Sequence, residues 1–430
     1  MRRVLAEHNL GAVPAVFRAA AGLSLYEVAD LVDRSRYTIG SYELGNRRAL
    51  HDDEVFGQFA AAVDLPYLAM LPYLFRNPGV ALAGDRVLRA VLEALGVDVD
   101  RREFGGLAAG SVAAAMLPEV SVPSRVTAAH IRYLQASVDT LYRQDQAVGG
   151  GAVLLAGLRQ WQRALRMLRE SSCTEAIKGQ LLAVTAEMGV CAGWIALSAG
   201  NHALSRRLHA GAQVVAGEAR DRVLTAHVLT NSSVVANHMA QTGPDRGPAR
   251  AGLQLSCQAA DSAHRTPVPR LRAMIAYRHA RSAALLGDRA AFRSAITRAR
   301  RELDRGSRVG EPVWAGFVDE AEITHEEGAG HVFLGEFARG EELSRRVLGG
   351  ELSPRRRANY GADLALSLLG QGASQDAIEA GTTVLTALEN GVTSGMALNK
   401  LRPVRVAARR ADDEEFCARF DALERTLITA

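Results

Sequence analysis

The chain has little of what a secreted, disulfide-rich or metal-binding protein needs. Its four cysteines in 430 residues, Cys173, Cys191, Cys257 and Cys417, follow neither a disulfide framework nor a metal-ligand spacing. The first residues include no apolar stretch long enough for a secretory signal. We therefore expect reduced thiols that pack as small apolar groups, in a cytoplasmic protein without a membrane span.

Aromatic residues and lysines are also scarce. Aromatics make up 5% of the chain, and Lys178 and Lys400 are the only lysines. Alanine, leucine and arginine dominate instead, and runs of β-branched residues are few, which is typical of chains that are helical almost throughout. The sequence therefore predicts an all-α fold. The net charge of +4 is small for this length, so bulk charge alone does not indicate a nucleic-acid partner.

Catalytic signatures are absent. The chain has no phosphate-binding glycine loop with a lysine, no HExxH and no GxSxG. His325 and His331 flank the segment HEEGAGH, but its two glycines predict a turn that keeps the histidines off one helical face, which argues against a metal site. Gly149–Gly151 is interpreted as a break between helices. We expect no cluster of converging titratable groups, and hence no enzyme, cofactor or metal.

Residues 17–48 are dense with signals that start and stop helices. Gly22 breaks a first helix, and Ser24 with Glu27 three residues later forms a capping box. A turn follows, and Ser35 is expected to cap a helix over residues 36–44 that ends at Gly45. The pattern predicts two short helices joined by a tight turn, the second with polar residues facing outward.

This segment resembles the phage-repressor or xenobiotic-response-element (XRE) family. The resemblance covers residues 12–75 and is carried by Gly22, Leu23, Ser24, Val28, Ala29, Ile39, Glu43, Gly45 and Arg47, with a later stretch from Val55 to Leu71 similar to the last helices of that family. It implies a five-helix helix-turn-helix domain over residues 1–78. Such a domain binds a double-stranded DNA operator as a homodimer and reads the major groove with the helix 36–44.

The resemblance also implies where DNA is contacted. The residues expected there are Arg34, Ser35, Arg36, Tyr37, Thr38, Ser41, Asn46, Arg47 and Arg48. Of these, Arg36, Tyr37 and Ser41 are expected to contact the bases. An arginine can donate two parallel hydrogen bonds to O6 and N7 of guanine. Leu25 departs from the family, since many relatives have a phosphate-contacting glutamine there. The alternative is a vestigial domain attached to a protein-interaction scaffold.

Residues 79–123 read as a linker with a short helix, and residues 124–430 as a helical repeat region. Glycines at Gly200, Gly243 and Gly287 recur 43 and 44 residues apart, and Gly335 or Gly340, then Gly372, continue the series. Each unit has a small residue seven places before its turn glycine. The pattern resembles an irregular tetratricopeptide (TPR) repeat and the C-terminal regions of actinobacterial XRE regulators. It implies an α-solenoid of antiparallel helix pairs that mediates dimerisation.

Such solenoids bind ligands along a concave groove. The register of the repeat places five candidate groove residues on successive first helices, and these are Trp194, Ser233, Asn237, Tyr277 and Arg281. A peptide or small-molecule effector is the expected occupant. The alternative for these side chains is ordinary packing between helices.

Overall fold

The computed structural model describes residues 15, 18–19, 23–32, 34–43, 122–241, 245–264, 266–306 and 311–427. Within these ranges every regular element is a helix, and the β-type pairing is one isolated parallel bridge between Arg125 and Ser172. The expected all-α class is therefore confirmed for the described part of the chain. The predicted linker up to residue 121 and the helix expected from Val55 lie outside the described residues.

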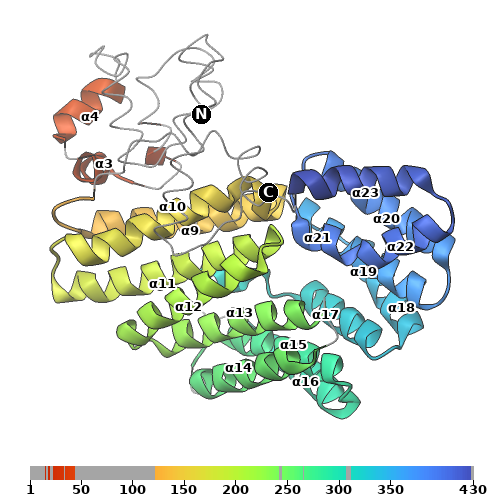
Figure 1. Cartoon of the computed structure of the whole chain (residues 1–430). Helices are drawn as coiled ribbons and strands as arrows, with labels where there is room; N and C mark the ends of the chain where they lie inside the picture. Colours follow the sequence, from red (N-terminus) through yellow and green to blue (C-terminus); the bar gives the residue numbers. More distant parts are fainter. Residues whose placement is uncertain are drawn as a thin grey trace, which may run out of the picture. The chain divides into compact units, whose positions relative to one another are not determined.

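The helices have the following bounds (Figure 1). They are α3 (Leu25–Leu31), α4 (Arg36–Glu43), α9 (Ala128–Val148), α10 (Gly150–Glu170), α11 (Glu175–Ser198), α12 (His202–Ala219), α13 (Arg222–Gln241), α14 (Gly247–Ala263), α15 (Pro269–Leu286), α16 (Arg289–Leu303), the 3-10 helix η4 (Val313–Phe317), α17 (Glu320–Phe333), α18 (Phe337–Leu348), α19 (Pro354–Gly370), α20 (Ser374–Glu389), α21 (Gly395–Lys400), α22 (Arg402–Arg410) and α23 (Glu414–Leu427).

Contacts divide the chain into two compact units. The N-terminal unit comprises Met1–Thr140 and Leu155–Met188, and the C-terminal unit comprises Leu141–Leu154 and Gly189–Thr429. In the N-terminal unit, α9 and α10 bury Leu134, Leu158 and Met167 completely. The boundaries fall inside α9, α10 and α11, so these helices contribute to both units.

Helix α11 is long and apolar enough to span a membrane by length and composition. Its most apolar window has a mean hydropathy of 1.6, but 83% of that window is buried inside the protein. Among the described residues it is the one helix with this property. Its apolar character is accounted for by its position as a core helix.

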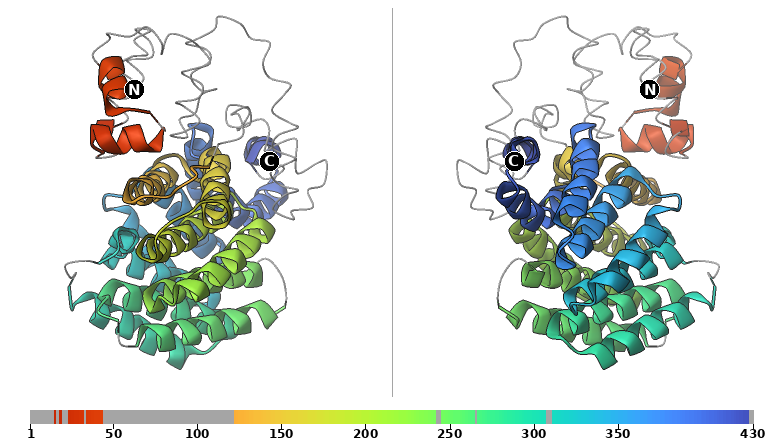
Figure 2. Two further views of the ribbon diagram at one scale, coloured as in Figure 1. Left: turned by 90° about the vertical axis from the view of Figure 1, so that its left-hand side faces the viewer. Right: turned by 90° about the vertical axis from the view of Figure 1, so that its right-hand side faces the viewer.

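The C-terminal unit is built from successive helices joined by short turns, several of which end at a glycine with positive φ (Figures 1 and 2). Gly200, Gly287, Gly335 and Gly372 have φ between 76° and 90°, as expected for turn glycines. Gly340 instead lies inside α18, so the turn there is at Gly335. Gly243 lies outside the described residues.

Two hydrophobic clusters hold this unit together. One is formed by α13 to α17 and contains the fully buried Tyr277 and Phe292, and the other is formed by α19 to α23 around Phe416 and Phe420. Small residues bring the helices close, as expected from the repeat. At Gly193 an added Cβ would lie 2.6 Å from Cε1 of His209, so only glycine lets α11 and α12 approach this closely.

A contact between distant segments closes the C-terminal unit on itself. Thr393 N donates to the carbonyl oxygen of Val148 at 2.7 Å, and Gly151 N donates to the carbonyl oxygen of Thr393 at 3.0 Å. Thr393 Oγ1 donates to the same Val148 oxygen at 2.7 Å and accepts from Ala152 N at 2.9 Å. We call this the closure contact; it joins residues 148–152 to Thr393, which an open repeat array would hold far apart.

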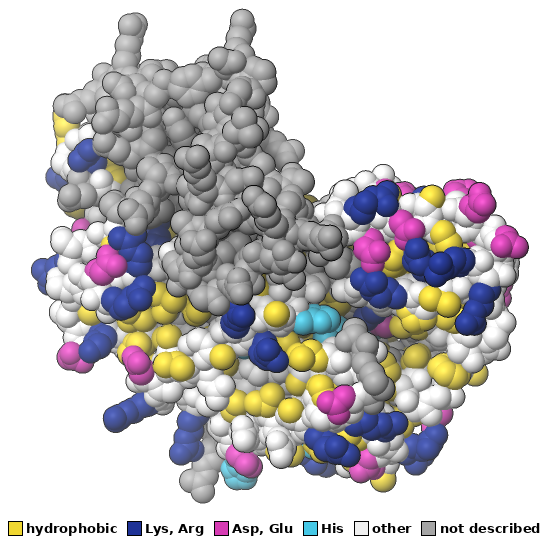
Figure 3. Space-filling view, viewed as in Figure 1, with side chains coloured by type: hydrophobic (Ala, Val, Ile, Leu, Met, Phe, Trp, Pro, Cys, Tyr) yellow, Lys and Arg dark blue, Asp and Glu magenta, His cyan; other side chains and the backbone are white. Residues whose placement is uncertain are grey.

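On the face drawn in Figure 3, cationic and acidic side chains are interspersed over the last helices. Arg405 pairs with Asp421 at 2.5 Å, and Arg419 pairs with Glu389 at 2.8 Å. These pairs are partly exposed, so each contributes at most about 1 kcal/mol. This mixed surface differs from the buried charges described below.

Candidate functional site

The segment expected to contact DNA forms two short helices with the predicted caps. Ser24 Oγ accepts from Glu27 N while the Glu27 carboxylate accepts from Ser24 N, so the capping box is confirmed. Ser35 Oγ accepts from Thr38 N at 3.1 Å at the start of α4. Val28 and Ile39 are fully buried, and they fix the apolar sides of α3 and α4.

The opposite side of α4 faces solvent. Tyr37 is 74% exposed, and Arg34, Ser35 and Arg36 are exposed as well, whereas Thr38 and Ser41 are half-buried. The Arg36 guanidinium contacts the Tyr26 hydroxyl and lies 4.8 Å from the centre of its ring. The predicted contact residues Asn46, Arg47 and Arg48 lie outside the described residues.

A bidentate ion pair connects Arg18 to Glu43, the last residue of α4. Arg18 Nε and Nη2 donate to the two carboxylate oxygens of Glu43, each at 2.9 Å. The hydrogen bond to Glu43 raises the pKa of Arg18 above its ordinary value. Glu43 is one of the residues that carry the family resemblance, and its position shows a structural reason for an acid there.

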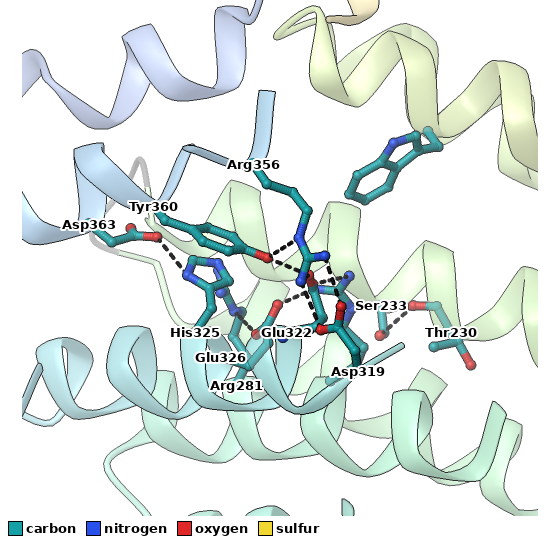
Figure 4. Close-up of polar contacts among 12 residues, drawn as sticks. Thr230, Ser233, Arg281, Asp319, Glu322, His325, Glu326, Arg356, Tyr360 and Asp363 are labelled. Atoms are coloured by element: carbon teal, nitrogen blue, oxygen red, sulfur yellow. Dashed lines mark hydrogen bonds and ion pairs between the residues drawn. The ribbon is translucent and has the colours of Figure 1, made fainter. Parts of the chain in front are cut away.

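A small polar cavity lies within the C-terminal unit, and its volume is about 50 Å³. Space of this size holds a few water molecules or one small polar group. Residues from α9, α11, α13, α15, η4, α17, α19 and α21 line it, and they combine aromatic rings with cationic and acidic side chains. Figure 4 shows how part of this charge network is connected.

In the first group of this network, the carboxylate of Glu326 pairs with two arginines. Glu326 Oε2 accepts from Arg281 Nε at 2.7 Å, and Glu326 Oε1 accepts from Arg278. The three side chains are at most 5% exposed. Burial opposes the charge of Arg278, but Glu326 and Glu322 outweigh it and raise the pKa of this guanidinium above its ordinary value. Arg278 and Arg281 are three residues apart on α15, so both reach the same face.

A second group links α17 to α19. The Tyr360 hydroxyl donates to Glu322 Oε2 at 2.5 Å and accepts from Arg356 Nε at 2.8 Å. Arg356 also donates to both oxygens of Asp319, at 3.0 and 2.9 Å. Burial, and then the negative charge of Glu322, raise the pKa of Tyr360 well above 10, so its proton stays in place at neutral pH.

The third group brings one of the two lysines of the chain into the interior. Lys400 Nζ donates to Asp363 Oδ2 at 2.7 Å, and His325 Nδ1 lies 3.5 Å from the same oxygen. Burial lowers the pKa of Lys400 although Asp363 opposes it. Burial, and then Lys400, lower the pKa of His325 well below 6.5. His325 is therefore neutral at pH 7, and it stacks on Tyr360 with ring centres 3.7 Å apart.

Aromatic side chains also line the cavity. Trp194 Nε1 donates to Asp145 Oδ2 at 2.9 Å, and Arg355 lies 5.3 Å from the centre of the Trp194 ring. Trp314 on η4 stacks on His227 at 3.5 Å with an interplanar angle of 3°. Planar rings and guanidinium groups thus share one small space.

Neither a protein-family model nor a curated protein matches this chain.

The structure places the five predicted groove residues differently. Trp194 and Arg281 line the cavity. Ser233, Asn237 and Tyr277 are fully buried and are not among the lining residues. Ser233 Oγ donates to the carbonyl oxygen of Thr230 at 2.7 Å, and Asn237 Oδ1 accepts from Ser282 Oγ at 2.9 Å, so both serve contacts within and between helices.

Two expectations for this region were wrong. The segment HEEGAGH was expected at a turn, but it lies inside α17, which Asp319 caps by accepting from Glu322 N at 2.7 Å. Its glycines serve close packing, because a Cβ at Gly330 would overlap the Phe292 ring. We also expected no cluster of converging titratable groups, and the structure brings together such a cluster. Its members that sequence reasoning missed are Arg278, Glu322, Glu326, Arg355, Arg356, Tyr360, Asp363 and Lys400.

The two histidines of that segment do not converge. His331 Nδ1 lies 2.6 Å from Glu336 Oε2, whereas His325 faces Asp363 and Tyr360. Among the described residues, no group of three or more histidine, cysteine, aspartate or glutamate side chains has an arrangement that could hold a metal ion.

Buried neutral histidines predict acid sensitivity. Burial lowers the pKa of His209 from 6.5 to about 4. Burial and His209 together lower that of His227 to about 3. The unfolded chain therefore binds protons first as pH falls below 6.5, and stability present at neutral pH is lost on acidification. For His209 alone we expect a loss of about 2 kcal/mol at pH 5.

Urea unfolding at pH 7 and pH 5 measures this effect. His209→Gln should reduce the difference in the free energy of unfolding between the two pH values by about 2 kcal/mol. The exposed His264 provides the control, since His264→Gln should keep the full pH dependence. An equal pH dependence of the free energy of unfolding in the wild type and His209→Gln would contradict the lowered pKa of His209.

Proposed function

We propose that this protein is a sequence-specific DNA-binding transcriptional regulator of the XRE helix-turn-helix type. The observation that supports it best is the pair α3 and α4, capped at Ser24 and Ser35, with Arg34 exposed just before α4 and Arg36 and Tyr37 exposed in its first turn. A helix with its apolar side buried and an arginine facing outward fits the major groove of DNA.

The proposed regulator acts as a homodimer in the cytoplasm. One recognition helix reads only a few base pairs, and two-fold symmetry doubles the contacts and the specificity. The TPR-like helical region is proposed to dimerise and to hold an effector. The cavity supports the second role, because charged and aromatic side chains there surround an open space rather than a packed core.

Selection of bound duplexes from a random DNA pool tests the proposal. The full-length protein should recover a two-fold symmetric motif, and Arg36→Ala should lose discrimination at the base pair it reads, by about 1 to 3 kcal/mol. Binding should also weaken steeply with salt. Arg206→Ala on α12 is the matched control, since this arginine is exposed and lies far from α4 in the sequence. Binding without a motif, or no binding, would overturn DNA reading.

A scaffold with a vestigial N-terminal domain is the second candidate. The cavity favours it, because binding there requires no DNA contact. The same Arg36→Ala variant separates the two functions, since a scaffold should keep all of its partner binding.

A further inference from the structure

The cavity wall has more cations than its own carboxylates neutralise directly. Five cationic side chains line the space, Arg278, Arg281, Arg355, Arg356 and Lys400, against the two carboxylates Glu322 and Glu326. The remaining acids of the network, Asp145, Asp319 and Asp363, are not among the lining residues. They bind Arg355, Arg356 and Lys400 from outside the lining shell. Positive charge therefore lies closer to the cavity than the negative charge that balances it.

Among the arginines that line the cavity, two have a buried Nε–H group without an acceptor. Arg278 Nε and Arg355 Nε are both without a hydrogen-bond partner, and these residues are only 4% and 5% exposed. Arg355 Nε lies 3.0 Å from Asp145 Oδ2, but its N–H is not aligned with that oxygen. Leaving charged donors unpaired in the interior is costly, and both residues line the cavity, so an anionic group bound there would lie beside them.

The size and the rim of the cavity limit the ligand. About 50 Å³ admits a group the size of a carboxylate and not a whole aromatic ring. The lining aromatics Tyr142, Trp194 and Phe317 are partly exposed, whereas Trp314 is buried. A ligand with an oxyanion at one end and an apolar body matches both parts.

We propose that this cavity binds a carboxylate attached to an aromatic or apolar body, with the carboxylate directed at Arg278 and Arg355 and the body against Trp194 and Phe317. Guanidinium groups pair with carboxylates through charge-assisted hydrogen bonds, and aromatic rings hold the apolar part. A free organic acid and the C-terminal end of a peptide share this chemistry. The inference rests on the proposed effector role of the cavity and does not depend on DNA reading by α4.

Calorimetric titration of the full-length protein, without DNA, tests the proposal with matched pairs of probes. Indole-3-acetate is compared with indole-3-acetamide, and N-acetyl-Gly-Phe is compared with its C-terminal amide. We expect at least one acid to bind at least tenfold more tightly than its amide. Preference for indole-3-acetate assigns a small organic acid, and preference for the dipeptide acid assigns a peptide end. Equal binding of acid and amide in both pairs, or no binding of any probe, would overturn the proposal.

Variants locate the binding. Arg355→Gln should weaken acid binding at least tenfold, whereas Arg357→Gln should leave it unchanged, because Arg357 lies two residues further on α19 and is exposed. Unchanged affinity in Arg355→Gln would contradict the assigned position. Should that variant fail to fold, the comparison of acid and amide on the wild type still decides the question. Failure of the DNA selection alone would leave this result unaffected.

Discussion

Replacing Glu326 with glutamine is expected to lower the free energy of unfolding by about 3 to 5 kcal/mol. Glu326 is the shared counter-ion of Arg278 and Arg281, and all three side chains are at most 5% exposed. The substitution keeps the shape of the side chain and removes its charge. Two guanidinium groups then stay buried beside a neutral amide, which compensates their charge far less than a carboxylate does. Urea denaturation followed by circular dichroism measures the loss.

An exposed ion pair provides the control for this variant. Arg339 and Glu342 pair at 2.5 Å on α18, but the Glu342 side chain is 65% exposed. Glu342→Gln should therefore change stability by no more than about 0.5 kcal/mol. Similar losses in the two variants would show that the cavity network is solvated, contrary to its burial.

Replacing Gly150 with alanine is expected to destabilise the protein by about 3 kcal/mol, at the upper end of the range for an overpacked interior. A Cβ there would overlap the carbonyl oxygen of Ile195 and would lie 2.7 Å from Ser198 Cβ and 2.8 Å from Ala199 N. Backbone atoms cannot rotate away, so α10 and α11 would have to separate, and the neighbouring closure contact would be strained. Thermal unfolding of the full-length chain measures the change.

The matched control is Gly179→Ala on α11. An added Cβ meets nothing within 4 Å there, and the position is exposed and helical. Alanine should then stabilise the helix by up to about 1 kcal/mol. A loss of stability in Gly150→Ala together with a gain in Gly179→Ala would support the packing explanation, whereas a gain in both variants would refute it.

Features that depend on neighbouring residues were predictable from the sequence. The capping box at Ser24 and Glu27 lies within four residues, and the turn glycines Gly200, Gly287 and Gly372 each end a local element. The alanine-rich composition indicated the all-α class, because helix propensity is a local property. The small residue at Gly193 was also predicted, since its spacing from the turn follows the repeat.

The cavity was not predictable in the same way. Its ion pairs join residues far apart in the sequence, from 34 positions between Glu322 and Arg356 to 210 positions between Asp145 and Arg355. On the sequence alone each of these looks like an ordinary charge on the solvated side of a helix. One signal was present: Glu322 and Glu326, four residues apart, lie on one face of α17, and Arg278 and Arg281, three residues apart, lie on one face of α15. This spacing was not recognised, because Gly328 and Gly330 of α17 led to the prediction of a turn.

The closure contact has a consequence for how the nascent chain folds. Thr393 completes its hydrogen bonds with residues 148–152, and Lys400 supplies the partner of Asp363. Roughly 200 residues separate Ser198 from Lys400, and the ribosome needs on the order of 10 to 40 seconds to add them. Until then the end of α11 lacks the cover of α21, where Gly395 packs on Ala199. We expect α11, the most apolar of the described helices, to need a chaperone during this interval, and a chain truncated before α21 to be cleared by proteases rather than to accumulate.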